Sequence, residues 1–319
     1  MVLLLTETDV RNLLTMPMAL EAVEEAFRSL ADGSAVNHSR RRLPMKGGLL
    51  HYMASAAHAR QVFGMKIYPT FGGRVDFLIP LYNTENGKLL ALIEGDWLGR
   101  MRTGAASGIA AKHMARLESK TLGLFGAGGQ ARTQMLAVCT VRPIETVRVY
   151  SRDPQKRADF IEEMQSHVSA EIVGVADPRA AVEGADIVTT MTSASQPVFE
   201  GAWLAPGTHV NAAGGNHIKR REIDGETVRR AHRIAVDSLE QAKLECGDLV
   251  MAVEEGITAW ENVVEFADIV AENVPGRESP DEITLFESQG ISIWDTVTAA
   301  YVYKLAQARG AGQQISLFD

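Results

Sequence analysis

A short glycine-rich segment constrains this chain more than any other feature. It reads Gly126-Ala-Gly128-Gly-Gln-Ala131, follows directly on an apolar run at 121–125, and leads into a helical pattern. In a strand–turn–helix unit, Gly126 permits the tight turn, Gly128 lets a pyrophosphate lie against the backbone, and Ala131 keeps the helix close to the strand. The start of the helix also offers unpaired N–H groups to phosphates. The pattern predicts a dinucleotide site, with a tight corner that binds nothing as the alternative. The residues expected at the turn are Gly126, Ala127, Gly128, Gly129 and Gln130.

The residues around this turn alternate between strand-like and helical patterns. Helical patterns separate most of the expected strands, which is typical of a doubly wound parallel sheet. The expected fold class is therefore α/β, with a Rossmann sheet. Strands are predicted at 121–125, 146–150, 172–175, 187–190, 209–212 and 234–236.

The N-terminal part has a different texture. Apolar residues at helical spacing predict a helix at 17–30, with Pro17 suited to its first position. Short β-like runs follow at 35–95, and Asn86-Gly87 predicts a hairpin between 78–82 and 89–93. A helix of small residues is expected at 102–114 and another helix at 293–308.

Composition excludes several classes of protein. Lys and Arg total 32 against 40 Asp and Glu, a net charge of −8 that argues against a broad nucleic-acid surface. The short apolar run at the start meets Glu7 and Asp9 at once, so neither a secretory signal nor a membrane span is expected. Two distant cysteines fit a reducing cytoplasm, and the scattered histidines predict no metal site.

The end of the second strand bears on cofactor choice. Ser151 and Arg152 stand where an NAD site usually has a carboxylate. A hydroxyl and a guanidinium suit a 2′-phosphate, so NADP(H) is favoured. NAD(H) stays possible if Asp153 turns inward, and Arg152 could instead be a solvated surface charge.

Several segments together resemble the ornithine cyclodeaminase/mu-crystallin family, in order along nearly the whole chain. The run around Arg102 is the most specific of them. The segments are Gly64-Met-Lys66-Ile, Met101-Arg102-Thr-Gly-Ala-Ala-Ser-Gly-Ile-Ala-Ala-Lys112, Gly126-Ala-Gly-Gly-Gln130, Asn211-Ala-Ala-Gly-Gly215, Arg221-Glu-Ile-Asp224, Val236-Asp-Ser-Leu-Glu-Gln-Ala242 and Ile283-Thr-Leu-Phe-Glu-Ser288.

The resemblance implies an organisation and a chemistry. It implies a homodimer with an N-terminal α+β substrate and dimerisation domain, 1–115 with 292–319, and a Rossmann domain, 116–291. The C-terminal helix would return to the first domain. Family chemistry is hydride exchange between a nicotinamide cofactor and the α-carbon of an amino or imino acid. Members include cyclodeaminases, alanine dehydrogenases, ketimine reductases and pyrroline-2-carboxylate reductases.

The resemblance also implies site residues. The family's cationic substrate pocket matches Arg40, Lys66 and Arg102, although Arg41 or Arg42 could take the first place. Fixed cations suit an α-imino carboxylate, and a partly desolvated lysine with a lowered pKa could move a proton at the imine nitrogen. Further positions fall where the family contacts the cofactor: Thr103, Thr192, Val210, Ala212, Ala213, Arg220 and Ser288.

Two positions depart from the family pattern. Cyclodeaminases carry an aspartate where this chain has Asn216, a third candidate catalytic position whose amide cannot accept a proton as a carboxylate does. Arg74 stands where relatives have a neutral residue, so it either recognises a second polar group on the substrate or lies outward as a loop charge.

These observations predict an enzyme that reduces a small α-imino acid with NAD(P)H and runs backwards as an amino-acid dehydrogenase. One alternative is an ornithine cyclodeaminase, against which Asn216 counts. Another is a mu-crystallin-like protein that binds NADPH or a small ligand without turnover.

Overall fold

The computed structural model describes residues 1–318 and divides the chain into two compact units. Unit 1 is Met1–Arg102 together with the chain from Ile291 onward, and unit 2 is Thr103–Gly290. Helix α3 (Asp96–Met114) therefore belongs to both units, whereas the sequence predicted a boundary after residue 115.

Unit 1 is built on a mixed sheet, the β17-β1-β8-β7-β5-β4-β2 path, with β3 paired to β4 and β6 paired to β5. The predicted hairpin is confirmed, because β7 and β8 pair antiparallel around Asn86-Gly87. The strands are β1 (Val2–Leu5), β2 (Ala35–Asn37), β3 (Arg41–Met45), β4 (Gly48–Ala57), β5 (Val62–Phe71), β6 (Arg74–Val75), β7 (Leu78–Asn83), β8 (Leu89–Glu94) and β17 (Gln313–Ile315).

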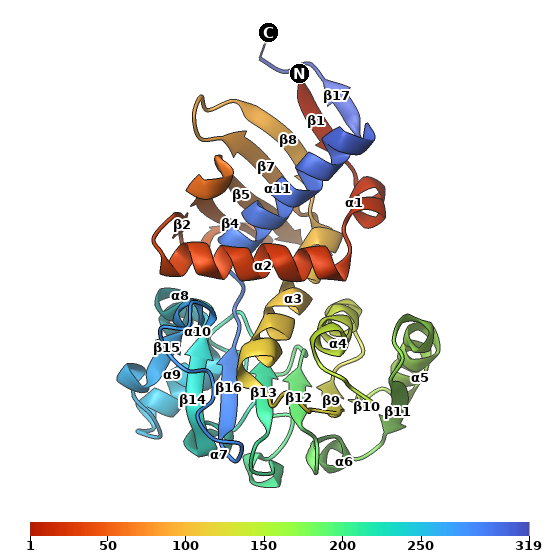
Figure 1. Cartoon of the computed structure of the whole chain (residues 1–319), viewed down its shortest axis with the longest axis vertical. Helices are drawn as coiled ribbons and strands as arrows, with labels where there is room; N and C mark the ends of the chain where they lie inside the picture. The colour runs from red at the N-terminus through yellow and green to blue at the C-terminus, as the bar shows by residue number, and fades with distance from the viewer. Residues whose placement is uncertain (319) are drawn as a thin grey trace. The chain divides into compact units, whose positions relative to one another are not determined.

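Two long helices pack together in unit 1, α2 (Met16–Ala31) and α11 (Ser292–Arg309), and α11 also packs on β4 and β5 (Figure 1). Both helices were predicted. Their shared core includes Phe27 and Trp294, whose rings meet edge to face at 5.3 Å. A shorter helix, α1 (Glu7–Leu13), precedes α2. The C-terminal helix is therefore part of the same hydrophobic core as the N-terminal segment.

Unit 2 is built on a parallel sheet with the order β11-β10-β9-β12-β13-β16-β14-β15 (Figure 1). This is a Rossmann sheet, in which the strand order reverses between β9 and β12. All six predicted strands are present, and two further strands, β15 and β16, were not predicted. The strands are β9 (Thr121–Phe125), β10 (Thr146–Tyr150), β11 (Glu171–Val175), β12 (Ile187–Thr190), β13 (His209–Ala212), β14 (Ala231–Val236), β15 (Val263–Glu265) and β16 (Ile283–Glu287).

Two hydrophobic clusters show that this sheet is covered on both faces. One joins β9, β10 and β11 to α3, α4 and α5, and the other joins β12, β13, β14 and β16 to α6, α7, α8 and α9. Burial on both faces explains why the central strands β9, β12, β13 and β16 are buried along almost their whole length. The helices are α4 (Gly129–Val141), α5 (Pro154–Met164), α6 (Pro178–Val182), α7 (Gly225–Arg230), α8 (Leu239–Glu245), α9 (Gly247–Glu254) and α10 (Phe266–Val270).

No described helix has both the length and the apolar character needed to span a membrane. Among residues 1–318, no cluster of three or more His, Cys, Asp or Glu is arranged to hold a metal ion.

Candidate active site

The glycine turn has the backbone geometry that the sequence predicted. Gly126 has φ +116°, and a Cβ there would lie 2.4 Å from the Met191 carbonyl oxygen, so only glycine fits. Gly128 is the N-cap of α4, where no side chain caps the helix, and a Cβ on Gly128 would meet no atom within 4 Å. The start of α4 therefore presents uncapped N–H groups beside open space, which fits the phosphates of a dinucleotide.

The other cofactor candidates of unit 2 gather mainly at one edge of the sheet. Because the strands are parallel, the segments that follow them reach the same edge, at the carboxyl ends. Val210 and Ala212 are buried in β13 itself, and Thr103 lies on α3, where its carbonyl oxygen accepts a hydrogen bond from Gln134 Nε2 at 3.3 Å. The candidates that follow strands are Gly126, Ser151, Arg152, Thr192, Ala213, Arg220 and Ser288.

The two charged residues after β10, Arg152 and Asp153, have different surroundings. Asp153 caps α5, with its carboxylate accepting hydrogen bonds from the backbone N–H groups of Gln155 and Lys156 at 3.0 and 3.1 Å. Arg152 is exposed, and Ser151 Oγ accepts from the Asp153 N–H at 3.4 Å. The Asp153 carboxylate is therefore engaged by its own helix.

A buried cluster of charges lies in unit 1. Lys66 Nζ donates to Asp295 Oδ1 at 3.0 Å, and Arg102 Nε donates to the same oxygen at 3.1 Å. All three residues are buried, with Asp295 only 1% exposed. We call Lys66, Arg102 and Asp295 the cation cluster.

Three elements supply this cluster. Residues alternate between faces along β5, and Lys66 lies on the buried face with Gly64 and Tyr68. Asp295 lies in the first turn of α11 and Arg102 on α3. A Cβ on Gly99 of α3 would lie 2.7 Å from Lys66 Nζ, so the glycine leaves the room that the ammonium group occupies.

The environment changes how these groups bind protons. Burial lowers the pKa of Lys66 to about 8; Asp295 opposes this shift, while Arg102 and Arg40 add to it. Burial would raise the pKa of Asp295, but Arg102 and Lys66 together hold it below its ordinary value. The cluster therefore combines a carboxylate that stays ionised with an ammonium group that can release its proton near neutral pH.

Of the three consecutive arginines, Arg40 is the buried one, at 6% exposed, and Arg41 is exposed. The positive charge of Arg40 helps to lower the pKa of Lys66, and the charges of Arg40 and Arg42 help to lower the pKa of His51. Burial, Arg42 and Arg40 lower the pKa of His51 to about 4.

An aromatic row adjoins Lys66. The His51 ring stacks on Tyr68 at 4.5 Å, Tyr68 contacts Phe77 at 4.8 Å, and Lys66 Nζ lies 4.6 Å from the Phe77 centroid. The cationic group therefore has a flat, largely apolar neighbour that the sequence analysis did not foresee.

Two predicted site residues, one in each unit, are exposed. The Arg74 side chain is 81% exposed and pairs with Asp76 at 2.7 Å, which is the outward of its two alternatives. Asn216 is exposed in the segment after β13, as is Arg220.

Sequence reasoning missed two buried acids. Asp295 stands in the apolar stretch Ile291-Ser-Ile-Trp-Asp295, where a lone carboxylate in a helix buried on nearly all sides was the available signal. Glu222 lies within the segment Arg221-Glu-Ile-Asp224 that carries the family resemblance, but the resemblance gave it no role.

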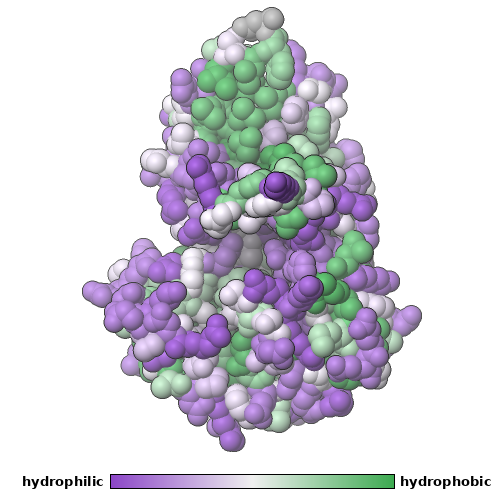
Figure 2. All heavy atoms as spheres, turned by 180° about the vertical axis from the view of Figure 1, so that it is seen from behind, coloured by the Kyte–Doolittle hydropathy of each residue, from purple (hydrophilic) through white to green (hydrophobic). Residues whose placement is uncertain are grey.

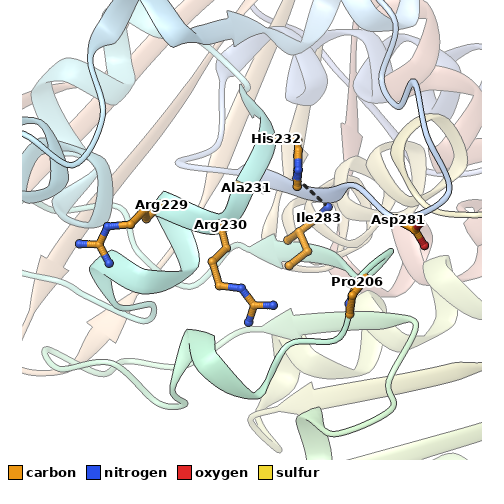
Figure 3. Close-up of a pocket in the computed structure, with 7 residues that line it drawn as sticks. All are labelled: Pro206, Arg229, Arg230, Ala231, His232, Asp281 and Ile283. Atoms are coloured by element: carbon orange, nitrogen blue, oxygen red, sulfur yellow. Dashed lines mark hydrogen bonds between the residues drawn. The ribbon is translucent and has the colours of Figure 1, made fainter.

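One surface cavity of about 260 Å³ in unit 2 is lined by Arg229, Arg230 and His232 (Figure 3). His232 lies near the start of β14 and accepts a hydrogen bond from the Ile283 N–H, at the start of β16. The cavity is thus at the amino ends of the strands, whereas open α/β sheets bind their ligands at the carboxyl ends. We do not count it as part of the site.

Relatives of known name resemble this chain along nearly its whole length. A pyrroline-2-carboxylate reductase of Bacillus cereus is 32% identical over 323 residues, covering 98% of this chain and 99% of the relative. The solved structure of the Thermococcus litoralis Delta(1)-pyrroline-2-carboxylate reductase, in complex with NADH and L-proline, is 38% identical with a TM-score of 0.94, and the match covers 98% of this chain and 100% of that one. An archaeal alanine dehydrogenase, solved as a dimer with bound NAD, is 33% identical with a TM-score of 0.92, and the match covers 99% of both chains.

The model of the ornithine cyclodeaminase/mu-crystallin family matches residues 1–310, almost the entire chain. This match agrees with the glycine turn, the parallel sheet and the buried cations described above. The chain belongs to the ornithine cyclodeaminase/mu-crystallin family.

Proposed function

We propose that this protein reduces a small α-imino acid of the ketimine or pyrroline-2-carboxylate type with NAD(P)H, and in reverse acts as an amino-acid dehydrogenase. The observation that carries the proposal is the cation cluster, in which a lysine of pKa about 8 shares Asp295 with Arg102. The names of the relatives support the same reaction class.

Two groups hold the substrate in this proposal. Arg102 and Arg40 attract its carboxylate, because a guanidinium can bind both carboxylate oxygens through its fork of N–H donors. Asp295 fixes Arg102 through Nε and prevents the buried cations from repelling one another unopposed. The row of Phe77, Tyr68 and His51 beside Lys66 suits an uncharged substrate ring.

Lys66 transfers the proton to or from the substrate nitrogen in this proposal. A reduced imine needs a proton at its nitrogen, and the Lys66 ammonium group donates it in the reductive direction. The neutral amine of Lys66 accepts a proton from the substrate amine in the oxidative direction. The glycine turn and the start of α4 hold the nicotinamide dinucleotide, which supplies or receives the hydride.

The experiment follows NADPH and NADH absorbance on addition of pyrroline-2-carboxylate, other cyclic imines, and keto acids with ammonia. Oxidation of either cofactor with at least one imino acid is expected. A flat trace with intact NADPH binding would favour the mu-crystallin-like alternative. Release of ammonia and proline from ornithine would favour the cyclodeaminase, which the amide of Asn216 disfavours.

We further propose a preference for NADP(H). Asp153 is occupied as the cap of α5, so Ser151 and Arg152 are left for a 2′-phosphate. Arg152→Ala should raise the NADPH dissociation constant by about tenfold and change the NADH dissociation constant little, because hydrogen bonds to charged groups are among the stronger ones. The similar solved structures contain NADH and NAD, so the preference has to be tested on this chain. An equal loss of affinity for NADPH and NADH in Arg152→Ala would contradict it.

A homodimer is the final part of the proposal. Tyr52, Ile67 and Leu78 lie side by side across β4, β5 and β7. They are on the face opposite Lys66, and Phe63 and Tyr82 stack at 4.9 Å beyond them. Hydrophobic residues gather near the top of Figure 2 on this sheet, as on a surface meant for a protein partner. Light scattering on the purified chain should give twice its mass of 34.7 kDa.

A further inference from the structure

One buried carboxylate joins several segments at the carboxyl edge of the parallel sheet. Glu222 Oε2 accepts hydrogen bonds from Thr190 Oγ1 at 2.9 Å and from the Gly214 N–H at 2.7 Å. Its Oε1 accepts from both the N–H and the Oγ1 of Thr192, each at 2.6 Å. Glu222 thereby connects the end of β12, the segment after β12 and the segment after β13.

The two connected segments approach each other very closely. A Cβ on Gly214 would lie 2.4 Å from the Thr192 carbonyl oxygen and 2.7 Å from Glu222 Oε1, so no side chain fits there. Thr192 Oγ1 also accepts a hydrogen bond from the Ala194 N–H at 3.1 Å. The backbone of both segments is therefore shaped around the Glu222 carboxylate.

Glu222 is itself held in place from behind. Asp248 of α9 accepts hydrogen bonds from the N–H groups of Glu222 and Ile223 at 2.9 and 3.0 Å. The Glu222 carbonyl oxygen accepts from the Val198 N–H at 2.9 Å. The backbone of Glu222 is therefore held by Asp248 and Val198, not by the segments that its carboxylate contacts.

From these contacts we infer that Glu222 is a positioning residue for dinucleotide binding. It sets Thr192 and the segment from Gly214 to Asn216 in the arrangement that receives the cofactor. The inference rests on the proposed function, because it needs a bound nicotinamide dinucleotide, and the family resemblance implies Thr192, Ala212 and Ala213 as positions that contact it. All four groups bonded to the carboxylate are donors, so its two oxygens act as acceptors only.

The test is Glu222→Gln, which keeps the shape of the side chain but replaces one acceptor oxygen with an NH₂ donor that faces donors. The NADPH dissociation constant, measured by fluorescence titration, should rise about tenfold or more, since hydrogen bonds to charged groups are strong. The KM for the imino acid should stay within about twofold of the wild type, because substrate binding is assigned to other residues.

Asp224→Asn is a matched control. Asp224 also accepts three hydrogen bonds, from the N–H and Oγ1 of Thr227 and from the Gly201 N–H, but these anchor α7 and Gly201. It should lower the melting temperature without changing the NADPH dissociation constant. If Glu222→Gln lowers the melting temperature as Asp224→Asn does and leaves NADPH binding unchanged, Glu222 is only structural and the inference is wrong.

A milder variant covers the case in which Glu222→Gln does not fold. Thr190→Val removes one donor to Glu222 with little change of shape, and a rise of about threefold in the NADPH dissociation constant is expected from a single lost hydrogen bond. An unchanged constant in this variant would overturn the inference. A wild-type chain that binds no nicotinamide dinucleotide would instead overturn the proposed function, so the two failures are distinguishable.

Discussion

The two units stabilise their buried charges in opposite ways. In the cation cluster of unit 1, one carboxylate compensates two cations, and the pKa of Asp295 is held low. In unit 2, Glu222, Asp248 and Glu287 are buried near one another, and mainly neutral donors surround the first two. Burial raises the pKa of all three; for Glu287 the nearby Asp248 adds to the rise. In the cation cluster, ion pairing keeps charged groups that can take part in the reaction. In unit 2, the hydrogen bonds of Glu222 and Asp248 to neutral donors fix the backbone around them.

The largest effect is expected for Lys66→Met. If Lys66 transfers the proton, turnover should fall by about 10²–10⁴-fold while the NADPH dissociation constant stays nearly unchanged. Stopped-flow and fluorescence titration measure the two quantities. Equal loss of turnover and of NADPH binding would show that the cation cluster acts on the fold rather than on the reaction.

Asp295→Asn should destabilise the chain strongly, by about 3–5 kcal/mol, because it leaves the buried Lys66 and Arg102 without their counter-charge. Urea unfolding measures the change. The exposed pair of Arg74 and Asp76 is the comparison, and Asp76→Asn should cost no more than about 1 kcal/mol. Similar losses in the two variants would contradict the account of the cation cluster.

The pH dependence of the reaction should follow Lys66. With its pKa at about 8, the ammonium form predominates below that pH, so kcat/KM for imine reduction should fall up to about tenfold per unit above pH 8. Amine oxidation needs the neutral amine of Lys66, so its kcat/KM should rise as the pH approaches 8 and level off above it. If the pH profiles of kcat/KM for reduction and oxidation do not show opposite trends near pH 8, Lys66 does not transfer the proton.

The last effect concerns how the stability of unit 2 depends on pH. The pKa of Asp248 is raised to about 7, so the folded chain binds more protons than the unfolded chain between roughly pH 4 and 7. This contribution to stability is present at low pH and is lost as the pH rises through about 7. Asp248→Asn should flatten the pH dependence of unfolding by up to about 1.4 kcal/mol per unit over that window. An unchanged slope would mean that Asp248 does not titrate there.

Local pattern predicted much of the fold. The strands from β9 to β14 and the helices α2 and α11 were found from apolar spacing and turn residues, since these depend on neighbours in the sequence. Strands β15 and β16 were missed, because the short apolar runs at 263–265 and 283–287 lacked a clear pattern of their own. Their place in the sheet depends on pairing with β14 and β13.

The sequence by itself determined the glycine turn and the parallel sheet, because both follow from short-range backbone and apolar patterns, and the family resemblance implied Lys66 and Arg102. Only the tertiary structure decided that Asp295, 229 positions from Lys66, completes the cluster. It also decided that Arg40 is buried while Arg41 is exposed, and that Arg74 points outward. Periodicity says which face of an element is buried, but the partner that meets a buried charge comes from another segment, and its choice depends on how the segments pack.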